Sequence, residues 1–338
     1  MKSINVAKRN ILFHVTLFLF FSLSLNFVTS AQEKVRVGLA WQPNDKAYDR
    51  VVRSIELAGG EAVILPQVRF ADFEYNDNKL SSKYLDSDGV LLQENADKVK
   101  RLTYHGTDID SIMQGIDAVV FLGGQDISST LFRVPEPWHG IAGDVCNATR
   151  DVSEYLTMAY CLDHDIPVLG LCRGMQMLAV VSGASMIQDL GTFYASQGME
   201  YNNLHRSVRD ENGNRHYTPH DVLVTDHSSL LYSIVHDDVI ENVPSWHHQV
   251  VGSVDGTELR VTGITLTQGY DVIEAIERKD KTFALGVQFH PEEAVRQHIY
   301  DIATATQFMQ LYEGVSYFKA LIGSGEVRGE RCEMRAKN

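Results

Sequence analysis

A short apolar run that leads directly into a glycine-flanked cysteine constrains this sequence most strongly. Residues 166–171 read Ile-Pro-Val-Leu-Gly-Leu, which is typical of a buried parallel strand. The residues that follow, up to Gly183, space their apolar side chains as a packed helix does. Cys172 lies between the two elements, with Gly170 and Gly174 on either side. The sequence therefore predicts a strand-to-helix turn with a cysteine at its tip.

A turn of this kind gives a cysteine the properties of a nucleophile. Small flanking residues let the backbone bend sharply, as in the Gly-x-Ser-x-Gly turn of serine hydrolases. The N-terminus of the next helix favours a nearby negative charge, which stabilises a thiolate at Cys172. A buried structural cysteine between chance glycines is the alternative, and the glycine spacing alone does not separate the two interpretations.

Strands and helices alternate along most of the chain. The opening β-α-β order implies a parallel sheet with right-handed crossovers, and so an α/β fold. Residues 67–106 are polar, and we expect them to form a surface excursion. Residues 323–338 are expected to form a polar C-terminal tail. The predicted strands are residues 34–40, 61–66, 116–122, 166–171, 220–224, 257–261, 272–276 and 282–289, and the predicted helices include residues 49–58, 108–115, 150–164 and 294–312.

Two further strands end in residues that can do chemistry. Gly123 and Gly124 follow the third predicted strand, where paired glycines let backbone N–H groups face a ligand. His290 follows the last predicted strand, and Glu292 is close enough to hold its imidazole. Because ligands of open parallel sheets bind at the carboxyl ends of the strands, we expect these residues to meet Cys172.

Together these residues fill the roles of nucleophilic catalysis. Cys172 would be the attacking group, His290 the base that takes and returns a proton, and Glu292 the group that orients the base. The backbone N–H groups of Gly124 and Arg173 would stabilise the developing oxyanion.

The N-terminal segment has the features of a secretory signal. Three basic residues precede an apolar run over residues 11–28, and small residues follow up to Ala31. We expect residues 1–31 to be removed, leaving a domain over residues 32–322 in a secreted, lumenal, vacuolar or periplasmic location. An uncleaved membrane anchor is the alternative. No later stretch of the sequence is long and apolar enough to span a bilayer, so no membrane contact is expected after removal.

The charge balance excludes one class of partner. The chain carries a net charge of −14, and removing the three basic residues of the signal leaves 27 basic against 44 acidic side chains, or −17. A chain this acidic is a poor ligand for a phosphate backbone, so we expect no nucleic-acid partner.

Cysteine and histidine usage favours neither a disulfide framework nor a metal site. Setting Cys172 aside leaves an odd number of cysteines, with a Cys146–Cys161 pair as an open alternative. The region 191–241 contains five histidines whose spacing fits no tight metal motif, so we interpret them as solvated loop residues and expect neither metal nor cofactor. These are His205, His216, His220, His227 and His236.

The motifs around the cysteine and the late histidine resemble a known superfamily. Gly-Leu-Cys172-Arg-Gly-Met-Gln176 and Gly-Val-Gln-Phe-His290-Pro-Glu292 are similar to the class I glutamine amidotransferases. The block Ser245-x-His-His-Gln249 resembles the branch of free-standing gamma-glutamyl hydrolases, especially the one that includes gamma-glutamyl-gamma-aminobutyrate hydrolase. The resemblance extends over about residues 35–312.

This resemblance implies a three-layer αβα sandwich of the flavodoxin-like kind around a mostly parallel sheet. It also implies hydrolysis of a gamma-glutamyl amide, in a small molecule or peptide, through a thioester on the cysteine. Gln176, His247, His248 and Gly123 would line the glutamyl pocket, and either histidine of the pair could point inward. No cofactor is implied, and a homodimer is an open possibility.

Two other functions are compatible with the same residues. The first is a glutaminase subunit that supplies ammonia to a synthetase, although the chain carries no synthetase domain. The second is a non-catalytic binding protein on the same fold, against which the intact cysteine, histidine and glutamate argue.

Overall fold

The structure is a computed structural model that describes residues 33–41, 46–138, 145–212, 216–267, 269–294 and 305–336. The chain divides into two compact units, residues 1–34 and 35–338, and the fold described below is that of the second unit. The predicted signal peptide lies outside the described residues. Within the described ranges, none of the helices has both the length and the apolar character needed to span a membrane.

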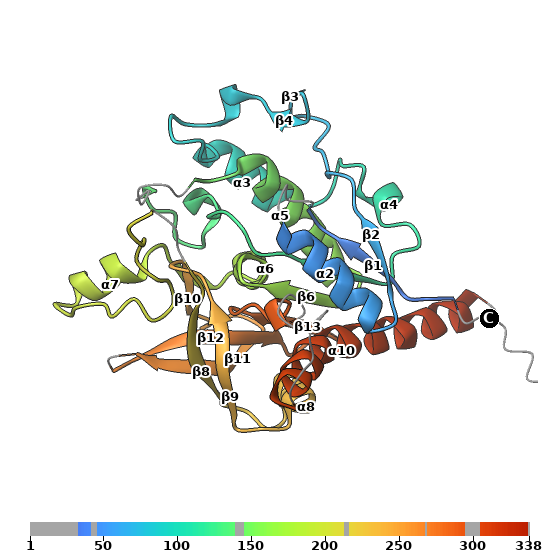
Figure 1. The fold of residues 1–338 in the computed structure, drawn as a ribbon. Coiled ribbons are helices and arrows are strands. Elements are labelled where there is room, and N and C mark those ends of the chain that lie inside the picture. The colour runs from blue at the N-terminus through green and yellow to red at the C-terminus, as the bar shows by residue number, and fades with distance from the viewer. Residues whose placement is uncertain are drawn as a thin grey trace, which may run out of the picture. The chain divides into compact units, whose positions relative to one another are not determined.

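A nine-stranded sheet forms the middle of the described fold (Figure 1). Its strands are β1 (Arg36–Leu39), β2 (Glu61–Ile64), β5 (Ala118–Phe121), β6 (Val168–Leu171), β8 (Thr218–Val224), β9 (Val239–Ser245), β11 (Leu259–Thr267), β12 (Tyr270–Arg278) and β13 (Ala284–Val287). Their order across the sheet is β2-β1-β5-β6-β13-β12-β11-β8-β9.

The sheet has a parallel half and an antiparallel half. Strands β2, β1, β5, β6 and β13 pair in parallel, as the β-α-β pattern of the sequence predicts. From β13 outward, β12, β11, β8 and β9 pair antiparallel. The carboxyl ends of β5, β6 and β13 therefore meet at one edge, and the glycine pair, the cysteine and the late histidine follow those three ends.

Helices cover both faces of the sheet. They are α2 (Lys46–Leu57), α3 (Gln93–Leu102), α4 (Ile109–Ile112), α5 (Ala148–Asp163), α6 (Arg173–Val181), α7 (Leu190–Ser196), α8 (Leu230–Val235) and α10 (Ala305–Ala336). Shorter elements are the 3-10 turns η1 (Ser82–Tyr84) and η2 (Ser129–Leu131), and the two-stranded sheets β3 (Tyr75–Asn76) with β4 (Lys79–Leu80) and β7 (Ser185–Ile187) with β10 (Val250–Ser253).

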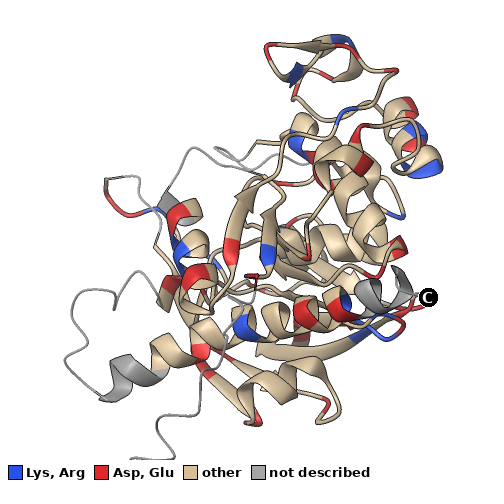
Figure 2. Cartoon of the chain, turned by 90° about the vertical axis from the view of Figure 1, so that its right-hand side faces the viewer, with Lys and Arg blue, Asp and Glu red and all other residues tan. Residues whose placement is uncertain are grey.

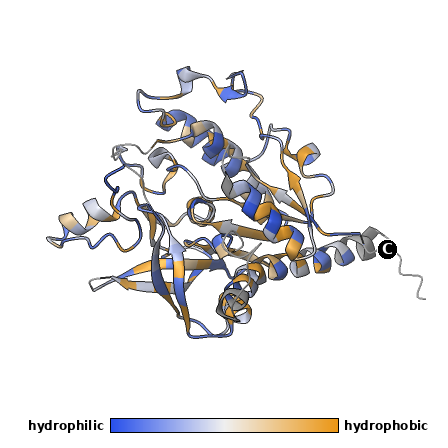
Figure 3. Cartoon of the chain, viewed as in Figure 1, coloured by the Kyte–Doolittle hydropathy of each residue, from blue (hydrophilic) through white to orange (hydrophobic). Residues whose placement is uncertain are grey.

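Alternation of side chains along the strands produces two apolar layers. Val119 and Phe121 of β5 pack in a cluster with α5 and α6, whereas Ala118 and Val120 pack in a second cluster with α2, α8 and α10. Figure 3 shows apolar residues as orange patches on α2, on α10 and on strands behind α6, beside blue polar ones, and Figure 2 shows charged residues mainly on helices and loops. The predicted three-layer α/β sandwich is confirmed.

Two sequence-based expectations differ from the structure, and the disulfide left open between Cys146 and Cys161 is not formed. The polar excursion after residue 66 is not confined to the surface, because Phe70, Phe73 and Leu91 are buried in the α5–α6 cluster. Its apolar residues are too irregularly spaced to reveal this burial. The closing helix, expected to end at residue 312, continues to Ala336 and includes the expected polar tail. Cys146 and Cys161 are free thiols.

Candidate active site

The turn between β6 and α6 holds Cys172 in a strained conformation. Its φ is +50° and its ψ −102°, a region that side chains rarely adopt. A Cβ atom at Gly170 would lie 2.6 Å from the backbone carbonyl of Gly174, and one at Gly174 would lie 2.2 Å from the Phe121 oxygen. Both glycines are therefore required, and the predicted sharp bend is present.

His290 is fixed at the end of β13 by its backbone and its ring. Its N–H donates to the Pro244 carbonyl at 2.9 Å, and Nδ1 lies 2.8 Å from Oε1 of Glu292. Tyr217 packs edge-on against the ring, with 5.2 Å between centroids. Because Nδ1 is engaged with Glu292, Nε2 is the ring nitrogen left to exchange a proton.

The imidazole of His290 and the thiol of Cys172 lie beside Gly123. A Cβ atom at Gly123 would come within 2.8 Å of His290 Cε1 and 3.6 Å of Cys172 Cβ. Burial lowers the pKa of His290, but the charges of Glu292 and Cys172, the Tyr217 phenol and a hydrogen bond with the thiol raise it well above its ordinary value. These interactions favour the imidazolium form of His290.

The two backbone N–H groups expected to form the oxyanion hole belong to Arg173 and Gly124. That of Arg173 belongs to the first turn of α6, where no intrahelical acceptor exists. Gly124 has a φ of +149°, and a Cβ atom there would lie 2.1 Å from Nη1 of Arg150. The Arg150 guanidinium also donates from Nη2 to the carbonyls of Leu122 and Gly123, at 2.9 and 3.0 Å. Arg150 thus fixes the glycine loop.

A set of fully buried charges, which we call the arginine–carboxylate cluster, supports both the glycine loop and the cysteine turn. Arg150 Nε donates to Glu154 at 2.8 Å, and the Arg173 guanidinium pairs with both Asp151 and Glu154. Asp151 also accepts from the N–H and hydroxyl of Ser128, at 3.0 and 2.6 Å. The two guanidinium groups and the two carboxylates therefore neutralise one another close to the Cys172 turn.

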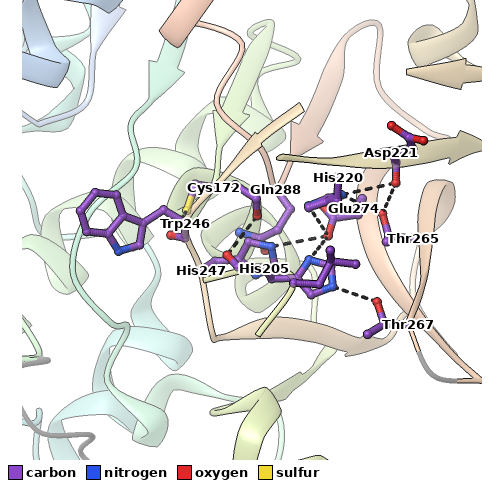
Figure 4. Close-up of polar contacts among 12 residues, drawn as sticks. Cys172, His205, His220, Asp221, Trp246, His247, Thr265, Thr267, Glu274 and Gln288 are labelled. Atoms are coloured by element: carbon purple, nitrogen blue, oxygen red, sulfur yellow. Dashed lines mark hydrogen bonds and ion pairs between the residues drawn. The ribbon is translucent and has the colours of Figure 1, made fainter. Parts of the chain in front are cut away.

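A pocket opens beside Cys172 and contains most of the residues expected to bind substrate. Gln176 donates from Nε2 to the Gln249 carbonyl at 2.8 Å, and the Cys172 sulfur lies 3.9 Å from the Trp246 carbonyl (Figure 4). Of the residues expected to bind substrate, Gln176, His247 and His248 line the pocket, whereas Gly123 is not among its lining residues. Gly124, expected in the oxyanion hole, lines it too, as do Trp246 and Gln249 beside the histidine pair. The lining residues that the sequence did not assign are Gln125, Asp126, Val145 and Arg206.

The pocket is lined by charged side chains of both signs. His248 lies between Asp126, at 2.9 Å from Nε2, and Asp189, at 3.3 Å from Nδ1. Burial lowers the pKa of His248, but its contacts with the two carboxylates raise it to about 9. The guanidinium of Arg206 lines the same pocket. Arg206 has no pattern around it in the sequence that would have identified it.

His247 has a different environment from its neighbour. Its Nδ1 lies 3.3 Å from the Gln249 carbonyl and its Nε2 3.5 Å from Glu274. His205 and His220 surround the same carboxylate, and we call these four residues the histidine–carboxylate cluster (Figure 4). The interpretation of the five histidines as solvated is therefore wrong for His205 and His220, which are 0% and 5% exposed.

The other three histidines of that region are exposed, as expected: His216, His227 and His236. No local signal in the sequence separates the two groups. His205, His220, His247 and Glu274 are separated by many residues, and only the pairing of the antiparallel strands brings them together.

The segment that carries Cys172, His290 and Glu292 matches a known family. The family model described as Peptidase C26 matches residues 99–292, more than half of the chain. Protein NtpR of Enterococcus hirae is 33% identical over 178 residues, which cover 52% of this chain and 67% of that protein. The glutamine amidotransferase-like protein YvdE of Lactococcus lactis is 30% identical over 190 residues, covering 55% and 70%. A solved glutamine amidotransferase of Thermotoga maritima aligns over 87% of this chain and 99% of its own, with a TM-score of 0.45 and 16% identity.

Proposed function

This chain belongs to the peptidase C26 family, within the class I glutamine amidotransferase-like superfamily, and on that premise we propose that it hydrolyses gamma-glutamyl amide bonds. The observation that carries the proposal is the strained Cys172 beside His290, whose ring is held by Glu292. The coarser assignment, a glutamine amidotransferase-like hydrolase, follows from the family and its relatives.

In the proposed reaction, the Cys172 thiolate attacks the side-chain carbonyl of a gamma-linked glutamate. The N–H groups of Gly124 and Arg173 receive the developing oxyanion. The His290 imidazolium then gives its proton to the leaving amine, so that the amide bond breaks and a thioester remains on the sulfur. In the second half, neutral His290 takes a proton from water, and the hydroxide attacks the thioester carbonyl. The C–S bond breaks, glutamate leaves, and the thiolate and the His290 imidazolium are restored.

The pocket supports a substrate with a free carboxylate next to the scissile amide. Arg206 supplies a positive charge on the wall that also contains Cys172. A gamma-glutamyl group carries an α-carboxylate a few bonds from the reacting carbonyl, so Arg206 is the residue that we expect to bind it. Arg206→Met should raise KM for a gamma-glutamyl substrate more than it lowers kcat, because the contact exists in the ground state.

Release of a chromogenic aniline from a gamma-glutamyl anilide tests the proposal. Cys172→Ala should lower kcat by about 10⁴-fold or more, because the covalent intermediate cannot form. Mass spectrometry of acid-quenched wild-type protein should detect a glutamyl adduct on the peptide that contains Cys172. Cys146→Ala is the matched control and should retain full activity, since that thiol is not in the pocket lining. Unchanged turnover in Cys172→Ala would refute the mechanism.

A second candidate function is release of ammonia from free glutamine. It is favoured by the description of relatives as glutamine amidotransferase-like. The two functions differ in the leaving group, so a panel that compares glutamine with gamma-glutamyl amines and peptides separates them. Ammonia release from glutamine with inert gamma-glutamyl peptides would favour the second function.

A further inference from the structure

We propose that four buried side chains behind the active-site pocket bind one zinc ion: His205, His220, His247 and Glu274. This site is separate from the proposed hydrolytic reaction and does not depend on it. Residue spacing does not reveal this site, because the four residues lie on different segments of the chain.

The distances in the histidine–carboxylate cluster match a four-coordinate ion. From Glu274 Oε1, His205 Nδ1 lies at 3.0 Å, His247 Nε2 at 3.5 Å and His220 Nε2 at 3.7 Å. The four ligand atoms all lie within 4.8 Å of one another. Ligands about 2.0–2.1 Å from a tetrahedral ion are separated by about 3.3 Å, which is close to the three distances from Glu274. The wider separations in the cluster, up to 4.8 Å, require the rings to move inward when the ion binds.

The atoms that face the centre of the cluster are buried and unsatisfied. The side chains of all four residues are at most 1% exposed. The three facing ring nitrogens and both oxygens of Glu274 make no hydrogen bond of good geometry. Buried polar atoms without partners are costly, and one central cation would satisfy all of these ligands at once.

The outward-facing nitrogens explain why the inward-facing ones lack partners. His247 Nδ1 lies 3.3 Å from the Gln249 carbonyl, which only accepts, so the neutral ring carries its hydrogen on Nδ1 and directs a lone pair at Glu274. His220 Nδ1 contacts Thr265 Oγ1 at 3.1 Å, while that hydroxyl donates to the Asp221 carbonyl at 2.6 Å. His220 Nε2 therefore carries no hydrogen and also directs a lone pair at Glu274. His205 Nε2 is held by Thr267 Oγ1 at 3.1 Å.

These outward contacts are those that orient histidine ligands in metal sites, where the second ring nitrogen bonds a carbonyl or hydroxyl. Lone pairs of neutral imidazoles turned toward a carboxylate repel it, whereas a cation between them attracts every ligand. An extra proton shared among the rings is the competing arrangement, and the experiments below separate the two.

The ligand set points to zinc and to a structural role. Three imidazole nitrogens and one carboxylate oxygen suit Zn²⁺, whereas Ca²⁺ and Mg²⁺ prefer shells of oxygen. Four protein ligands in a closed, buried site leave no position for a substrate, which is typical of structural rather than catalytic zinc.

Such an ion would hold the wall of the pocket. It would join His220 on β8 and Glu274 on β12 to His247, which directly follows Trp246. The Trp246 carbonyl contacts the Cys172 sulfur, and Figure 4 shows both residues beside the cluster. Metal binding would therefore hold the antiparallel half of the sheet in a fixed position relative to the active-site residues.

The first experiment measures metal content in the whole protein, purified without a histidine tag, incubated with ZnSO₄ and desalted. We expect about one zinc per chain, falling at least fivefold in His220→Ala and in Glu274→Gln. His227→Ala is the matched control and should retain zinc, because that exposed histidine lies outside the cluster. Equal zinc content in wild type and both ligand variants would overturn the proposal.

The second experiment uses only wild-type protein, so it stands even if the variants do not fold. Treatment with a strong chelator should lower Tm by roughly 5–10 °C, and ZnSO₄ should restore it. Cobalt(II) added to the chelated protein should give the intense visible absorption of tetrahedral coordination. A Tm unaffected by chelator and zinc, together with no such absorption, would identify the cluster as proton-sharing and overturn the proposal.

Discussion

The arginine–carboxylate cluster and the histidine–carboxylate cluster are both fully buried, and both support segments that reach Cys172. In the first, Arg150 and Arg173 face Asp151 and Glu154, and only the Nε atom of Arg173 lacks a hydrogen bond. In the second, one carboxylate faces three imidazoles and none of the facing atoms has a hydrogen-bond partner.

The contrast shows what each cluster needs in order to be stable. Guanidinium groups carry their own positive charge and five donors, so they neutralise buried carboxylates without help. Neutral imidazoles offer lone pairs, and burying several of them around a carboxylate requires a cation or a proton. In the arginine–carboxylate cluster, the chain itself supplies the positive charge that neutralises the carboxylates. In the histidine–carboxylate cluster, that charge must come from a bound cation or proton.

The largest expected effect tests this contrast directly. Glu154→Gln should lower the free energy of unfolding by about 3–5 kcal/mol whether zinc or chelator is present, because it leaves buried guanidinium groups without their partner. Glu274→Gln should cause a comparable loss only in zinc, since without the ion it removes an unpaired buried charge. Urea unfolding in both conditions measures this. The contrast fails if Glu274→Gln has the same effect with chelator as with zinc.

The next effect is on catalysis and concerns the glycine loop that Arg150 holds. Gly124→Ala should lower kcat by about 10²–10³-fold, because its methyl group would displace Arg150 and with it an oxyanion donor. Gly256→Ala is the control, since Gly256 also has a positive φ (+74°) but lies in an open turn outside the pocket lining. That variant should be destabilised by only about 1 kcal/mol and should retain full activity. Equal loss of kcat in both would remove Gly124 from the mechanism.

A third effect concerns the hydrogen-bonded pair of His290 and Glu292. The charge of Glu292 helps to raise the pKa of His290, so kcat/KM should persist above neutral pH and fall as the imidazolium deprotonates. Glu292→Gln should move this alkaline limb to lower pH, as rate profiles of the two proteins would reveal. The same pair stabilises the fold fully below the unfolded histidine pKa of about 6.5, and that contribution is lost as pH rises through the folded pKa. An unmoved limb would show that Glu292 does not act on His290.

The smallest effect concerns the start of the helix that carries the arginine–carboxylate cluster. The Asn147 side chain accepts from the Arg150 N–H at 3.1 Å and caps α5. Asn147→Ala should cost about 1 kcal/mol in thermal or urea unfolding, and Asn147→Asp should cost much less because it retains the cap. A loss in the alanine variant as large as that in Glu154→Gln would mean that the cap, rather than the ion pairs, holds the cluster.

Local patterns explain why the parallel half of the fold was predictable. About 18 residues specify the turn at Cys172. They contain an apolar run before the cysteine, a glycine on each side of it and helical spacing of apolar residues after it. His290 and Glu292 could be placed for the same reason, because they directly follow an apolar strand whose carboxyl end belongs to the same sheet edge.

The sequence by itself determined the cysteine turn, the class of fold and the residues proposed for the chemistry, because each depends on neighbours close along the chain. Only the tertiary structure decided that His205, His220, His247 and Glu274 share one buried centre, and that Arg206 lines the pocket. These positions depend on the register of antiparallel strands and on loops between them. Hydrophobic periodicity reports which face of a strand is buried, and it contains no information about which distant polar side chains will meet there.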